Sequence, residues 1–163
     1  SQPFYRVRGT IKLPDGPVTV SGKAWLDREW SSQPLSADQT GWDWISLHLD
    51  TGEKLMGFQL RNSDGTAYRS ATWIGADGAT HAMSHPHLNM EPLSRTSVAG
   101  RQVPTRWNVM LPEHNLDVTI EAINPKAWMD LSIAYWEGPV VVSGSHSGMG
   151  YLEMTGYPVS PAN

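Results

Sequence analysis

The sequence predicts an all-β fold in which an antiparallel meander of strands closes into a barrel or a sandwich. Short runs of the 163-residue chain alternate apolar and polar residues, which is the period of a β-strand. Turn signals separate these runs at intervals of about ten to twelve residues, as in up-and-down β proteins. No stretch carries the 3.6-residue period of a long helix. We therefore expect a single antiparallel β domain of ordinary size.

The candidate strands are placed by these turn signals. The run 5–13 leads through Pro14-Asp15-Gly16 into the run 18–29, and Asp50-Thr51-Gly52 separates 42–49 from 54–61. Asn62-Ser63-Asp64-Gly65 then leads into 67–74, which Asp77-Gly78 follows. The remaining strands are expected at 88–92, 107–111, 116–122, 131–137, 140–144 and 150–156. The single helical candidate is a short turn at 125–130.

Composition excludes several classes of partner. The net charge is −4 without a basic cluster, which argues against nucleic acid. No apolar run reaches the length of a membrane span. There is no cysteine, so disulfides and thiolate metal sites are excluded, and no cofactor is expected. Eight Trp and five Tyr stand against two Phe, and such rings suit the walls of a pocket for a hydrophobic small molecule.

The faces of the run 42–49 differ in character. Ile45 and Leu47 belong to an apolar face that we expect in the core, whereas Trp42, Trp44 and His48 share the other face. If that mixed face lines the barrel, with Arg61 supplied by the next strand, it could hold an apolar ligand with a polar end. The alternative is an outer sheet face whose polar groups are solvated.

The segment Gly22-Lys-Ala-Trp-Leu-Asp-Arg-Glu-Trp30 concentrates charge in a predicted strand. Alternation places Trp25, Asp27 and Glu29 on one face. Two carboxylates confined about 7 Å apart can act as a catalytic pair in which one serves as general acid. The alternative is a structural network in which they bind arginines of neighbouring strands, such as Arg61 or Arg69. On the opposite face Arg28 and Trp30 suit a structural cation–π stack.

Four motifs carry a resemblance to a known family. They are Ala24-Trp-Leu-Asp-Arg-Glu-Trp30, Gly41-Trp-Asp-Trp44, Tyr135-Trp-Glu-Gly138 and Gly150-Tyr-Leu-Glu-Met-Thr-Gly-Tyr157. In this order they resemble the carotenoid hydratase (hydroxyneurosporene synthase) and AttH-like family. Members have two successive lipocalin-like domains, and this chain is similar to the second, C-terminal one. The resemblance implies a lipocalin-like barrel, a secreted or periplasmic protein, and an N-terminal lipocalin-like domain as partner.

The resemblance also implies a site. In carotenoid hydratases the first motif carries an acid that is proposed to protonate a double bond, and this acid falls on Asp27. The tyrosine of that motif falls on Trp25, and its His-Asn pair is replaced by Arg28-Glu29. The other proposed catalytic groups of those hydratases lie upstream of the matching segment. Some relatives are labelled hydrolases, but the sequence shows no nucleophile elbow.

His81, His85 and His87 form the one metal-like cluster of the sequence. Two histidines at a spacing of two on a strand can chelate one ion. No carboxylate lies within the cluster, although Glu91 is near. We therefore expect a polar loop and no bound metal.

Two functions follow as hypotheses. The first is an enzyme that adds water to, or rearranges, an apolar unsaturated isoprenoid or lipid-like substrate. Asp27 would donate the proton and Glu29 would adjust its acidity, while the tryptophan rings of residues 25, 42 and 44 would face the developing carbocation. The second is a non-catalytic binding module or carrier for a hydrophobic ligand. Such a carrier could be accessory to a transporter. A third reading makes the barrel only a structural cap for its partner domain.

Overall fold

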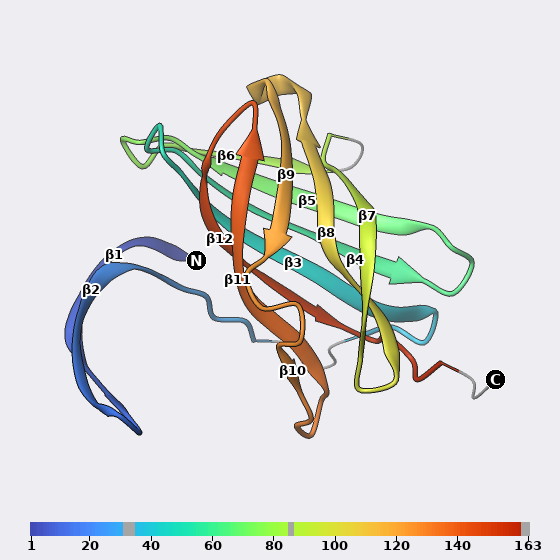
Figure 1. Ribbon diagram of the computed structural model, residues 1–163. Coiled ribbons are helices and arrows are strands. Elements are labelled where there is room, and N and C mark those ends of the chain that lie inside the picture. The colour runs from blue at the N-terminus through green and yellow to red at the C-terminus, as the bar shows by residue number, and fades with distance from the viewer. Residues whose placement is uncertain (31–34, 85–86, 161–163) are drawn as a thin grey trace. The chain divides into compact units, whose positions relative to one another are not determined.

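The computed structural model describes residues 1–30, 35–84 and 87–160, and the chain divides into two units, Ser1–Pro34 and Leu35–Asn163 (Figure 1). The first unit is an antiparallel ribbon of β1 (Gln2–Leu13) and β2 (Gly16–Leu26). The turn at Pro14-Asp15-Gly16 is where the sequence predicts it, and Gly16 takes a positive φ of 124°.

Strand β2 ends three residues earlier than the sequence predicts. Leu26 pairs with Gln2, which is the first residue of β1, so no strand remains to pair with Asp27, Arg28 or Glu29. The alternation of faces therefore stops before the charged residues. The prediction of a strand over 18–29 was wrong at this end for that reason.

The second unit is one antiparallel sheet. Its strand order is β6-β5-β4-β3-β12-β11-β9-β8-β7, with β10 paired to β11. The strands are β3 (Gln39–Leu49), β4 (Lys54–Asn62), β5 (Ala67–Ile74), β6 (Thr80–Ser84), β7 (Asn89–Val98), β8 (Arg101–Leu111), β9 (Leu116–Ala122), β10 (Trp128–Met129), β11 (Tyr135–Gly144) and β12 (Gly148–Thr155). One short 3-10 helix, η1 (Pro112–His114), links β8 to β9.

This sheet curls over its own inner face. In Figure 1 strands β8, β9 and β11 cross the direction of β3, β4 and β5. The edge strands β6 and β7 do not pair among the described residues, so the sheet forms a half-barrel. The prediction of an all-β, antiparallel, lipocalin-like fold is confirmed. Among the described residues, no helix is long and apolar enough to cross a membrane.

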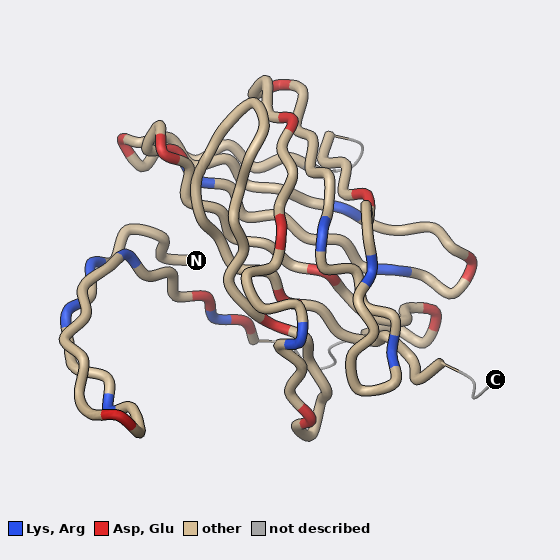
Figure 2. The backbone as a smooth tube through the Cα atoms, in the orientation of Figure 1, with Lys and Arg blue, Asp and Glu red and all other residues tan. Residues whose placement is uncertain are grey.

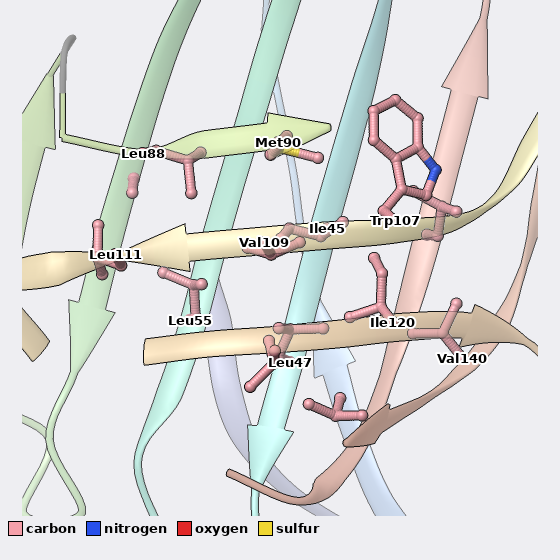
Figure 3. Packing of buried hydrophobic residues seen from close by; sticks show 14 of the residues in the cluster. Ile45, Leu47, Leu55, Leu88, Met90, Trp107, Val109, Leu111, Ile120 and Val140 are labelled. Carbon is pink, nitrogen blue, oxygen red and sulfur yellow. The ribbon is translucent and has the colours of Figure 1, made fainter. Parts of the chain in front are cut away.

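The inner face holds the hydrophobic core. Ile45 and Leu47 of β3 are fully buried, as the sequence predicts, and Val109 of β8 and Ile120 of β9 pack from the other side of the curl (Figure 3). Such alternate burial along paired strands keeps one face of the sheet dry. The core cluster therefore occupies the inner face. The mixed face of Trp42, Trp44 and His48, which could have lined a barrel, lies on the outside of the sheet instead.

Strands β7 and β8 extend well beyond the predicted runs 88–92 and 107–111. Three further elements differ from the sequence prediction. The helical turn expected at 125–130 is instead a tight turn, in which the Trp128 amide donates to the Lys126 carbonyl, followed by β10. Trp128 pairs with Trp136 across β10 and β11, which favours an extended backbone there. The strands expected at 131–137 and 140–144 are replaced by one strand, β11, which begins only at Tyr135 and runs on through Gly138. Strand β6 was not predicted, because its five residues are mostly polar and lie at a sheet edge.

Candidate functional site

The outer face of β3 carries two tryptophans that the sequence analysis singled out. Trp42 and Trp44 alternate with the buried Asp43 and Ile45, and both rings are half-buried. The Trp42 Nε1 atom donates a hydrogen bond of 2.8 Å to Glu153 Oε1 on β12. The Trp42 ring also meets the Tyr135 ring edge to face, with the centroids 6.0 Å apart. Hydrogen bond and ring contact together fix the Trp42 ring in place.

Register extends this surface across five strands. Trp44 is paired with Phe58 of β4 and with Glu153 of β12, and the Phe58 ring lies 6.1 Å from the Tyr68 ring of β5. His48 lies further along the same face of β3. We call this surface the aromatic face, and define it by Trp42, Trp44, Phe58, Tyr68, Tyr135 and Tyr151.

Two carboxylates lie within the aromatic face. Glu137 of β11 is paired directly with Glu153 of β12, and Tyr151 is two residues from Glu153 on the same face. Burial, followed by the neighbouring charges of Glu137 and Glu153, raises the pKa of the Tyr151 hydroxyl. Tyr151 therefore keeps its proton and can donate a hydrogen bond at neutral pH.

The inner face contains a buried carboxylate that the sequence analysis did not select. Asp43 has no exposed surface. The Tyr157 hydroxyl donates to its Oδ1 at 2.8 Å, Gln59 Nε2 donates to its Oδ2 at 2.7 Å, and Arg61 Nε lies 3.1 Å from the same oxygen. We call Asp43, Gln59, Arg61 and Tyr157 the Asp43 cluster.

The electrostatics of the Asp43 cluster combine burial with pairing. Burial raises the pKa of Asp43 above its ordinary value, and Arg61, Gln59 and Tyr157 oppose this shift without cancelling it. Burial and the adjacent carboxylate also raise the pKa of the Tyr157 hydroxyl, which therefore remains a donor. The Arg61 guanidinium lies 4.1 Å from the centre of the Tyr157 ring and donates to the Thr155 carbonyl.

Two further arginines surround the Asp43 cluster. The Arg95 guanidinium of β7 lies 6.0 Å from the centre of the Tyr157 ring. Arg69 of β5 donates from Nε to Gln59 Oε1 at 3.0 Å. The cluster thus links β3, β4, β5, β7 and the residues after β12 around one tyrosine. Arg61, which the sequence predicts as a ligand-binding residue, lies on the inner face and not beside Trp42 and Trp44.

Asp27 and its neighbours are exposed residues of the first unit. The Asp27 side chain is 40% exposed and contacts the Ser1 amino group at 3.4 Å. It is therefore not confined on a strand face with Glu29, which corrects the geometric part of that prediction. The Arg28 guanidinium does lie over the Trp30 ring, at 4.7 Å, although Trp30 is 78% exposed. Trp25 is half-buried within β2.

The predicted residues thus fall in both units. Trp25, Asp27 and Glu29 belong to the first, whereas Trp42, Trp44, His48 and Arg61 belong to the second. The structure brings Trp42, Trp44 and His48 onto one face. The catalytic role of Asp27 and Glu29 stays a prediction.

Asp43 and Gln59 were missed, but both carry a sequence signal. Asp43 lies an even number of residues from the apolar residues 45, 47 and 49, so its side chain is on the same, core-facing side of the strand. Gln59 is likewise on the same face of its strand as the buried Leu55. A polar residue at a core-facing position of a strand is a better indicator of a buried site than a cluster of charges at a strand end.

The histidines are distributed over several contacts. His81 lies 6.2 Å from His114, between ring centroids, and His114 stacks on Trp73 at 4.2 Å. His87 hydrogen-bonds Glu113, and His85 lies outside the described residues. Within the part of the chain that the structure describes, no three His, Asp or Glu side chains are placed to share a metal ion.

Comparisons with known proteins agree with this architecture. A family model described as AttH-like matches residues 1–157. A crystal structure of a Nitrosomonas europaea protein with a provisional AttH designation is 33% identical, with a TM-score of 0.87. The match covers 95% of this chain and 50% of that one, so this chain spans about half the length of the related protein. No curated protein sequence matches the chain.

Proposed function

This chain belongs to the AttH-like family, and from that premise we propose that it binds an apolar, unsaturated ligand, isoprenoid or lipid-like, on the aromatic face. The observation that carries this proposal is the run of six rings over β5, β4, β3, β12 and β11. Large apolar patches on a protein surface mark interaction sites. The inner face is filled by the core cluster, which favours the outer face as the ligand surface.

The aromatic face suits a flat, conjugated or isoprenoid chain. Trp and Tyr offer wide apolar surfaces at low conformational cost, and a π-face attracts positive charge that develops on a polyene. Tyr151 and Glu153 supply polar atoms at one side of the rings. The surface therefore favours a molecule that is apolar over most of its length.

Trp44→Ala should weaken binding of retinol, a neutral unsaturated isoprenoid, by about tenfold or more. The indole covers the centre of the aromatic face, and losing the burial of one large ring costs about 1.4 kcal/mol or more of binding free energy. Titration of retinol fluorescence measures the dissociation constant. Trp30→Ala is the matched control, because Trp30 belongs to the first unit, where it stacks on Arg28, and its removal should leave the affinity unchanged. Equal affinities of the parent and Trp44→Ala would refute this site.

A second candidate function is acid-assisted addition of water to a double bond of the same ligand. The specific observation in its favour is the Glu137–Glu153 pair among the rings of the aromatic face. A carboxylic acid would protonate one carbon of the double bond, the rings would face the resulting carbocation, and water would add to it and then release a proton. The family resemblance offers Asp27, with Glu29, as the other candidate acid.

Glu153→Gln is expected to lower such turnover by about 10²-fold or more, the typical contribution of a general acid. Incubation of the full chain with squalene in ¹⁸O-labelled water, followed by mass spectrometry, measures hydration directly. Asp27→Asn should retain the activity if Glu153 is the acid. The reverse pattern assigns the proton to Asp27, and an unlabelled product from the parent leaves ligand binding as the function. Retinol affinity controls for the integrity of the aromatic face in each variant.

The proposed partner is an N-terminal lipocalin-like domain of the same protein, in a secreted or periplasmic setting. The support for it is the half-length coverage of the related Nitrosomonas europaea chain. Aromatic residues that remain accessible in the second unit, such as Tyr68 and Tyr151, are available to such a domain or to the ligand.

A further inference from the structure

We propose that Arg69 and Arg95, set around the Asp43 cluster, form a binding subsite for an anionic oxygen group, a phosphate or carboxylate. The site lies on the inner-face side of the half-barrel and is separate from the aromatic face. It does not rest on the proposed ligand or on hydration chemistry.

The cluster and its surroundings hold more positive than negative charge. Three guanidiniums, those of Arg61, Arg69 and Arg95, surround the single carboxylate of Asp43. Both oxygens of that carboxylate are already occupied, one by Tyr157 and the other by Gln59 and Arg61. Asp43 therefore neutralises one arginine, and the other two have no anionic partner among the residues that the structure describes.

Arg69 and Arg95 have only neutral acceptors in the part of the chain that the structure describes. Arg69 donates from Nε to Gln59 Oε1, and Arg95 donates from NH1 to the Gln102 carbonyl at 3.2 Å. A guanidinium has five N–H donors, so each side chain keeps several donors that have no acceptor in the described protein. Neither arginine is fully buried, so these donors remain accessible from solvent.

Two of the three guanidiniums meet at one tyrosine although they come from distant strands. Arg95 of β7 and Arg61 of β4 both lie over the Tyr157 ring, and Arg69 reaches the cluster through Gln59. Figure 2 colours Lys and Arg blue along the backbone, and most of the second unit is tan. Arg95 also contributes a favourable charge interaction to Asp43. The Asp43 cluster therefore holds Arg61 and Arg95 at the Tyr157 ring and Arg69 at Gln59 before any ligand arrives.

The geometry suits an oxyanion better than a neutral ligand. Planar guanidiniums bind carboxylate and phosphate oxygens through paired hydrogen bonds, which are stronger than bonds between neutral groups. Like charges held near one another repel, and an anion between them relieves that repulsion. The Tyr157 hydroxyl is already committed to Asp43, so the arginines are the groups that remain for the ligand.

Titration of the full chain with inorganic phosphate tests the proposal. Isothermal calorimetry at constant ionic strength, with chloride as the replaced anion, should show one saturable site in the parent. Arg69→Gln and Arg95→Gln should each weaken phosphate binding by at least tenfold. Arg106→Gln is the matched control, because Arg106 already pairs with Glu121 at 3.6 Å, and it should bind phosphate as the parent does.

Arg95→Lys keeps the positive charge but removes the planar guanidinium with its paired N–H donors. This variant should bind phosphate more weakly than the parent but fold equally well. This variant keeps the test decisive even where a glutamine variant is unstable. No phosphate binding above chloride, or equal loss in Arg106→Gln, would overturn the proposal. Retinol carries no charge and phosphate has no apolar part, so this failure is distinct from failure of the aromatic face.

Two further probes identify the source of the anion. Acetate tests whether a carboxylate is accepted in place of phosphate. n-Decyl phosphate, used below its micelle concentration, tests whether the anion is the head of an amphipathic molecule. Tighter binding of decyl phosphate than of inorganic phosphate, lost in Arg69→Gln, assigns a lipid-like source. Equal binding of the two assigns a free anion.

Discussion

Asp43→Ala is expected to lower the free energy of unfolding by about 3–5 kcal/mol, the usual cost of removing one partner from a buried charge pair. The substitution leaves the Tyr157 hydroxyl, the Gln59 amide and the Arg61 guanidinium without their acceptor. Each of these donors is then desolvated without compensation. Urea denaturation followed by near-ultraviolet circular dichroism measures the change.

Asp130→Ala is the control for this experiment. Asp130 is an exposed carboxylate of the same unit, and its removal should change stability by about 0.5 kcal/mol or less. A neutral or stabilising effect of Asp43→Ala would show that the desolvation of the charge outweighs its three hydrogen-bonding partners. In that case the carboxylate would not stabilise the Asp43 cluster, and the positions of Arg69 and Arg95 could not be explained by its charge.

The same substitution has a defined pH dependence. The pKa of Asp43 is raised in the folded chain above its ordinary value of 3.8, chiefly by burial. Folding therefore favours the protonated acid, and stability from this group is fully present below the unfolded pKa and is lost as pH rises through the folded pKa. The difference in unfolding free energy between the parent and Asp43→Ala should consequently grow as the pH is lowered from neutral.

Much of the fold could be predicted from the sequence, because alternation and turns are local signals. The strands at 67–74 and 116–122 have the predicted bounds, and the turn at residues 14–16 lies where glycine and proline place it. The sequence could not show that β2 ends at Leu26, since that depends on where its pairing partner begins. Nor could it place the two curled halves of the sheet against each other.

The candidate site was predicted only in part for a related reason. Trp42, Trp44 and His48 share a face because they alternate along one strand. The Asp43 cluster depends instead on contacts far apart in the chain, since Tyr157 lies 114 residues from Asp43. The emphasis on Asp27 followed from the density of charge in its segment, yet a dense run of charge at a strand end is readily solvated. Asp43 is a single charged residue at a core-facing position, and because it is buried its contacts matter more for stability.

Close packing of glycines holds the end of β12 against the start of β3, beside the Asp43 cluster. Gly156 has a φ of +76°, and a Cβ built on it would lie 1.9 Å from the Thr40 carbonyl oxygen and 2.8 Å from the Gly41 Cα. These are backbone atoms of a paired strand, so they cannot move aside as a flexible side chain can. Tyr157 follows directly, and its hydroxyl is the donor to Asp43.

Gly156→Ala is therefore expected to cost about 3 kcal/mol or more, the sum of left-handed strain near 1–2 kcal/mol and overpacking of similar size. Gly65→Ala separates the two terms, because Gly65 has a φ of +85° but nothing within 4 Å of its Cβ position, so only the strain of about 1–2 kcal/mol applies. Urea denaturation of both variants measures the difference. Equal losses would mean that the backbone of β3 yields to the methyl group. A larger loss for Gly156→Ala, with weaker phosphate binding, would show that this contact positions Tyr157 and through it the arginines.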